Sequence, residues 1–197
     1  MTTPSYPLVL ENLKEHGLLL ETDARLPNVS TLVLGEPVRG SWWAHPRSHE
    51  IFRVNCALED HPDALVTKLV SGKITFIHRL LWPSVVAIGR AREPWQIARL
   101  STNARKLLAR ADKAPVETNS SLTKAASELE KLLLVSSEQF HTERGAHVRR
   151  LESWDHWRHR SGFAASDMAA DQARRKLEEV LDSLNRRFHA SGRLPWQ

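Results

Sequence analysis

The stretch that decides the fold of this chain reads LVTKLVSGKITFIH and covers residues 65–78. Its two halves are rich in Val, Ile, Thr and Phe, which favour strands, and Ser71-Gly72 between them favours a tight turn. The stretch therefore predicts a β-hairpin. Alternation places Phe76 and His78 on the same face of its second strand.

Helical patterns lie on both sides of this hairpin. Upstream, apolar residues recur at helical spacing over 46–60, where Pro46 suits the first turn, and residues 9–20 form a candidate helix of the lead-in. Downstream, a short helix is expected over 83–90. These elements predict an N-terminal helix and hairpin module with a Trp-rich loop, at residues 1–95.

A second set of elements follows, and we place it at residues 96–160. Its expected order is an amphipathic helix capped by Ser101, a short extended piece, a second helix and two strands joined by a basic loop. These elements fall at residues 100–111, 115–118, 121–133, 135–141 and 147–152. This order is that of a winged helix.

Residues of about 99–153 resemble a winged-helix module, with a compact turn where the middle helix usually lies. The resemblance is carried by AASELEKLLLV, residues 125–135, which is similar to the end of a recognition helix passing into the wing. More loosely, the chain resembles the bacterial winged-helix DNA glycosylases, so the resemblance implies DNA binding. Their Gln-x-Gln or Gln-x-Asp signature is absent, and no catalytic residue carries over, because the glutamines stand far apart at Gln96, Gln139, Gln172 and Gln197.

A C-terminal amphipathic helix is expected within residues 161–197. Its apolar residues repeat at helical spacing from Leu177 to Phe188, and they can pack on the core or form a homodimer contact. The predicted fold class is therefore α+β, mainly α, with winged-helix-like modules, short β-hairpins and this last helix.

Composition limits the class of protein. Of 197 residues, 41% are apolar and 26% charged, which is ordinary globular composition and argues against a disordered chain. The single cysteine, Cys56, excludes an intramolecular disulfide and fits a reducing cytoplasm. No signal peptide is evident, and no apolar run approaches the roughly 20 residues of a membrane span. We expect a soluble cytoplasmic protein with no membrane partner.

Basic residues predict a nucleic-acid partner. The formal charge is +5, and most of the excess follows residue 100. The candidate DNA-binding residues lie on the second helix and the wing, where cations would bind phosphates of double-stranded or damaged DNA without reading sequence. They are Lys124, His141, Arg144, His147, Arg149 and Arg150. The alternative is a solvated strand face.

A second candidate site is the string GEPVRGSWWAHPRSHE, residues 35–50. The adjacent indoles of Trp42 and Trp43 are expected to point in different directions, so one can pack while the other stays available. The functional interpretation is a stacking platform for a nucleotide base, with Arg39 and Arg47 near its phosphate. The alternative is that both tryptophans pin the loop to the core.

The end of the hairpin would complete this pocket if the loop folds against it. The candidate substrate-binding residues are Arg39, Trp42, Trp43, Arg47, His78, Arg79 and Trp82. Acid–base chemistry would fall to Glu36, His45, His49 and Glu50, with Glu36 stabilising an oxocarbenium ion during N-glycosidic cleavage. No His-Glu-x-x-His motif exists, so no metal and no cofactor are predicted. His78 can equally be a satisfied core histidine.

The leading prediction is a cytoplasmic DNA-binding protein of winged-helix type that acts in DNA repair or another DNA transaction through backbone contacts. Two alternatives stay open. One is a DNA N-glycosylase or related hydrolase that uses the Glu/Trp/His pocket, and the other is a protein-interaction or regulatory module without nucleic acid. Whether the protein is an enzyme is therefore left open.

Overall fold

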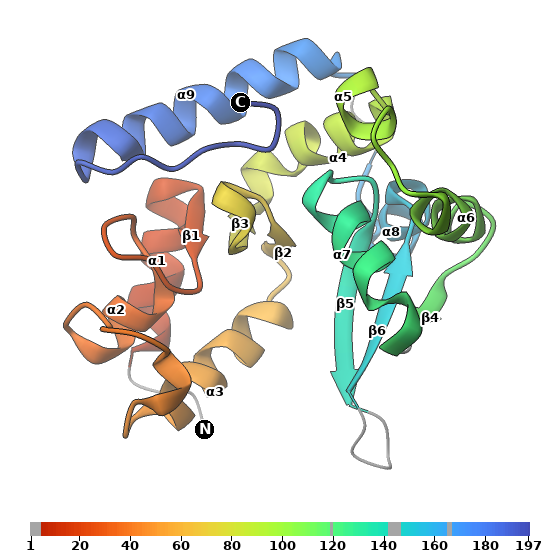
Figure 1. Ribbon diagram of the computed structural model, residues 1–197. Coiled ribbons are helices and arrows are strands. Elements are labelled where there is room, and N and C mark those ends of the chain that lie inside the picture. Colours follow the sequence, from red (N-terminus) through yellow and green to blue (C-terminus); the bar gives the residue numbers. More distant parts are fainter. Residues whose placement is uncertain (1–4, 119, 142–146, 165–166) are drawn as a thin grey trace. The chain divides into compact units, whose positions relative to one another are not determined.

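The computed structural model describes residues 5–118, 120–141, 147–164 and 167–197 (Figure 1). The chain divides into two compact units, the first formed by residues 1–82 with 175–195 and 197, the second by residues 83–174 with 196. This division precedes the expected boundary at 95/96. Helices hold 55% of the residues and strands 13%, so the predicted α+β, mainly α class is confirmed.

The first unit runs helix, strand, helix, helix, strand, strand. Its elements are α1 (Tyr6–His16), β1 (Leu18–Leu20), α2 (Val29–Leu34), the 3₁₀ turn η1 (Trp42–Ala44), α3 (Ser48–Glu59), β2 (Ala64–Lys68), η2 (Val70–Gly72), β3 (Ile74–His78) and η3 (Arg79–Leu81). The sheet order is β1-β3-β2, and both pairs are antiparallel. Leu65 pairs with Ile77 and Thr67 with Thr75, so the predicted hairpin is confirmed.

The predicted helix over 9–20 is too long. It ends at His16 because Gly17 takes a left-handed φ of 74° and its N–H bonds to the carbonyl of Leu13. The three leucines that follow form β1, in which every side chain is buried. An unbroken apolar run does not alternate, so its periodicity could not distinguish a strand from a buried helix end.

The last helix, α9 (Ala170–Arg187), buries its apolar stripe within the chain: Leu177, Leu181 and Leu184 are each less than 5% exposed. The tail after it is also fixed, because the N–H of Ser71 donates to the carbonyl of Arg193 at 2.7 Å. These leucines pack inside the chain, so this stripe is not free for a homodimer contact. No helix in the described part of the chain has the length and hydropathy that a membrane span requires.

The second unit contains the helix, short strand, helix and two strands in the order expected from the sequence. Its elements are α4 (Trp82–Ala91), which begins one residue before the division, α5 (Pro94–Ile97), α6 (Thr102–Ala111), β4 (Val116–Thr118), η4 (Ser120–Leu122), α7 (Thr123–Lys131), β5 (Ser136–His141), β6 (His147–Glu152) and α8 (Trp154–Ser161). The sheet order is β4-β6-β5, again antiparallel (Figure 1). The expected cap is confirmed, since Ser101 Oγ accepts from the N–H of Ala104.

Candidate functional site

The tryptophan pair of the first unit divides as expected into a packed and an available side chain. Trp42 is 4% exposed and Trp43 62%. The indoles do not diverge, however: their centroids lie 3.9 Å apart and their planes differ by 24°, so Trp43 stacks on Trp42. Phe52 of α3 is 41% exposed, and its ring centroid lies 5.8 Å from that of Trp43. Trp43 and Phe52 form an exposed surface that we call the aromatic platform.

Trp42 anchors the platform to the core of the first unit. Its ring packs in the same buried cluster as Leu13 and Ile51. Its indole N–H donates to the carboxylate of Glu21, which also accepts from Asn55 Nδ2 at 3.2 Å. Burial raises the pKa of Glu21, and the bond from Trp42 opposes this rise. Sequence reasoning missed Glu21, because nothing in the residues around it distinguishes it from a solvated glutamate.

Glu21→Gln should change how stability depends on pH. Folding raises the pKa of Glu21, so the folded chain holds the proton of this carboxyl more tightly than the unfolded chain does. The free energy of unfolding of the wild type therefore falls as pH rises above the ordinary glutamate pKa. The variant does not titrate here. Its free energy of unfolding should therefore gain on the wild type as pH rises above about 4. Urea unfolding across this range measures the difference, and parallel curves would contradict the buried carboxylate.

Arg47 and Glu50 hold the loop that carries the platform. Arg47 Nε and Nη2 each donate to one Glu50 carboxylate oxygen at 2.8 Å, which lowers the pKa of Glu50. The same guanidinium donates to the carbonyls of Val33, at 3.1 Å, and Leu34, at the end of α2. His45 Nδ1 accepts from the Arg47 N–H at 3.1 Å. These three predicted site residues therefore fix the loop in place.

The three candidates at the end of the hairpin also have local partners. His78 is buried, and its Nδ1 accepts from the N–H of Leu80; burial lowers its pKa. Arg79 pairs with Asp63 at 2.9 Å. Trp82 is 6% exposed and donates its indole N–H to the carbonyl of Ile77 at 3.0 Å. These partners belong to the hairpin and the turns at its end, not to the loop of residues 35–50.

The remaining candidates of the first unit are at the surface. Glu36 and Arg39 are exposed in the loop after α2, and His49 is exposed in the first turn of α3. Arg53, one helical turn beyond His49, is exposed as well and was not predicted. The side chains of these four form no hydrogen bond or ion pair with another described residue.

The predicted wing of the second unit is largely charge-compensated where it is described. Arg149 pairs with Glu130 at 3.2 Å, and Arg150 with Glu152 at 3.7 Å; both carboxylates are 5% exposed or less. Arg144 and the side chains of His141 and His147 lie outside the described residues. Lys124 is exposed at the start of α7.

Uncompensated positive charge gathers on α6. The basic side chains in and around this helix, which we call the α6 cationic face, are all exposed: Arg99, Arg105, Lys106, Arg110 and Lys113. The opposite side of the helix is buried from Ala104 to Ala111. The acid that follows α6, Asp112, pairs with Arg92. Lys106, Arg110 and Lys113 have no carboxylate partner among the described residues.

Neighbouring groups leave this face cationic. Arg105 donates to the backbone carbonyls of Ile97, at 2.8 Å, and Leu100, which orient the guanidinium without neutralising it. Glu128 of α7 is engaged at the start of α6, where its carboxylate accepts from the N–H and the hydroxyl of Ser101 at 2.7 and 2.8 Å. The sequence carried the signal, since residues 99–111 contain four basic side chains and no acid.

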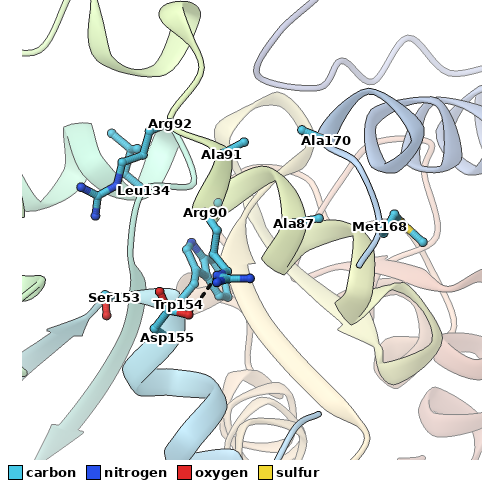
Figure 2. Close-up of a pocket in the computed structure, with 11 residues that line it drawn as sticks. Ala87, Arg90, Ala91, Arg92, Leu134, Ser153, Trp154, Asp155, Met168 and Ala170 are labelled. Atoms are coloured by element: carbon cyan, nitrogen blue, oxygen red, sulfur yellow. Dashed lines mark ion pairs between the residues drawn. The ribbon is translucent and has the colours of Figure 1, made fainter. Parts of the chain in front are cut away.

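Two cavities of the second unit are lined by charges that pair with each other. The first, of about 390 Å³, lies beside Trp154, and an Arg90–Asp155 ion pair of 2.9 Å lies among its lining residues (Figure 2). The second, of about 540 Å³, is lined by Arg160 and Glu152, which are also paired. Glu36 lines neither. Within the described residues, no group of His, Cys, Asp and Glu is placed to hold a metal ion.

Comparison with known proteins adds no relative. No family model, no curated protein and no solved structure matches the chain. Its function is therefore inferred from the residues themselves.

Proposed function

We propose that this protein binds double-stranded DNA through the sugar–phosphate backbone, in DNA repair or another DNA transaction of the cytoplasm. The observation that carries the proposal is the α6 cationic face: exposed basic side chains, no acid within the helix, and no carboxylate partner for Lys106, Arg110 or Lys113 among the described residues. Fold alone assigns no function, but a winged-helix-like unit with such a face favours DNA over other polyanions.

The dimensions of the face suit a run of phosphates. From Arg105 to Lys113 an α-helical path rises by about 12 Å at about 1.5 Å per residue. Each strand of double-stranded DNA carries one phosphate per roughly 3.4 Å of axis, so about three or four phosphates of one strand fall within that length. The basic side chains can therefore contact several phosphates at once without distorting the helix.

Helix α7, which would be the recognition helix, does not favour base reading. The outward residues of α7 include Lys124 and Lys131, but Glu128 between them is engaged with Ser101. No paired array of Asn, Gln or Arg side chains is presented on this described helix for base edges. Backbone contacts position a protein on DNA without sequence information, so we expect affinity with little sequence preference. The glycosylase alternative has no observation that favours it, because Glu36 is exposed on a loop.

The test compares two double charge reversals. Lys106→Glu with Arg110→Glu should weaken binding to a 20-base-pair duplex by about 10-fold or more and reduce the slope of log K against log salt by about 2. The matched control is Lys176→Glu with Arg186→Glu, two exposed cations of α9 that also have no partner among the described residues. Fluorescence anisotropy at several salt concentrations measures both.

The control separates a local contact from net charge. Both variants change the formal charge equally, so only a contact at α6 makes the first variant weaker than the second. If both variants lose duplex affinity equally, the loss comes from overall charge, and the assignment of binding to α6 is overturned. No binding of wild-type protein to the duplex at low salt would overturn DNA binding itself.

A further inference from the structure

The aromatic platform of the first unit is unusual within this chain. All seven tryptophans lie in the described residues, and Trp43 alone is exposed; Trp42, Trp82, Trp154 and Trp157 are each 6% exposed or less. Phe52 beside it is also exposed, so two aromatic side chains adjoin at the surface. The two rings are therefore exposed to solvent in the folded chain, and such a surface favours an apolar or aromatic partner.

The platform is also rigid, which lowers the entropy cost of binding. One face of Trp43 lies against Trp42, whose ring is packed in the core and whose N–H is bonded to Glu21. The loop on which both stand is fixed by the contacts of Arg47 with Glu50 and α2. A ring held in this way can receive a flat ligand without first being ordered.

The charges around the platform select the kind of ligand. Arg53 follows Phe52 on α3, His49 lies one turn earlier on the same helix, and Arg39 belongs to the loop that leads to Trp43; all are exposed. Arg39 and Arg53 form no ion pair among the described residues, whereas Arg47 is bound by Glu50. Exposed aromatic rings with unpaired guanidinium groups on the same helix and loop match a flat base carried on a phosphate backbone.

We propose that the aromatic platform stacks an unpaired nucleotide base, which gives the protein a site for single-stranded DNA distinct from the α6 cationic face. The inference rests on the proposed function, since it names a second DNA structure as a ligand. The base would extend the stack of Trp42 and Trp43 by one ring, with Phe52 tilted at 45° beside it. Stacking tolerates any base, so no sequence preference is expected.

The test uses a labelled 12-nucleotide oligo-dT strand and a strand of equal length whose central residues are abasic. Wild-type protein should bind the oligo-dT strand more tightly, because the abasic strand keeps the phosphates but offers no rings. Trp43→Ala should weaken oligo-dT binding by about 5- to 100-fold and abolish the preference over the abasic strand. Trp43→Phe, which keeps a ring, should retain most of the affinity.

Duplex binding separates this inference from the proposed function. Trp43→Ala should bind the 20-base-pair duplex as the wild type does, whereas the Lys106→Glu, Arg110→Glu variant should lose it. If the wild type binds the duplex but shows no preference for oligo-dT, or if Trp43→Ala keeps that preference, base stacking is overturned and DNA binding stands. A change from dimer to monomer in Trp43→Ala, measured by sedimentation, would make the platform a protein contact and likewise overturn it.

Discussion

Gly89→Ala is expected to lower the free energy of unfolding by about 2–4 kcal/mol, because α4 packs against Trp154 at this glycine. A Cβ at residue 89 would lie 2.1 Å from Trp154 Nε1 and 2.7 Å from the carbonyl oxygen of Leu133. Neither neighbour can yield easily, since Trp154 is 2% exposed and its Nε1 donates to that same carbonyl at 2.6 Å. The methyl group must therefore separate the helix from the ring or break a buried hydrogen bond.

Helix propensity acts in the opposite direction and provides the control. Alanine in a helix interior is favoured over glycine by about 1 kcal/mol, so a glycine with open space beside it would gain from the change. Urea unfolding of Gly89→Ala, alone and combined with Trp154→Leu, decides between these effects. The cost should largely vanish in the Trp154→Leu background, because a double-mutant cycle reveals the coupling between neighbours in contact. A neutral or stabilising single variant would mean that Trp154 does not pack on Gly89.

Local patterns were enough to predict the main elements of both units. The hairpin at residues 65–78 and the cap at Ser101 follow from strand-favouring residues, turn residues and helix spacing within short windows. Strand β1 was missed because three adjacent leucines show no alternation of apolar and polar residues. The three-stranded sheet of the first unit depends on that strand, so it emerges only when Leu18–Leu20 is paired with β3.

Side-chain partners could be predicted far less well than elements. Residues 35–50 were singled out because two adjacent tryptophans in a Gly- and Pro-rich loop are rare, and one of the two is exposed as expected. The partners of Arg149 and Arg150 are buried carboxylates from α7 and from the same strand. No spacing rule predicts the pair of Arg149 with Glu130, which joins two elements, whereas Arg150 and Glu152 lie two residues apart on one face of β6. The positive charge of α6, in contrast, can be predicted from the residues of that helix alone.

Trp42→Ala and Trp43→Ala form a matched pair whose effects on stability should differ sharply. Removing the buried ring of Trp42 should lower the free energy of unfolding by about 3–5 kcal/mol, because it leaves a cavity beside Leu13 and Ile51. It also deprives the carboxylate of Glu21 of its indole donor. Removing the exposed ring of Trp43 loses only the stack on Trp42 and part of the contact with Phe52, which is worth about 1 kcal/mol.

Urea unfolding of both variants under one condition measures this difference. Similar costs would contradict the division of the pair into a core ring and a surface ring. The small cost at Trp43 has a consequence for function as well. Because Trp43→Ala should stay folded, a loss of oligo-dT binding by that variant would report the surface it presents and not the stability of the unit that carries it.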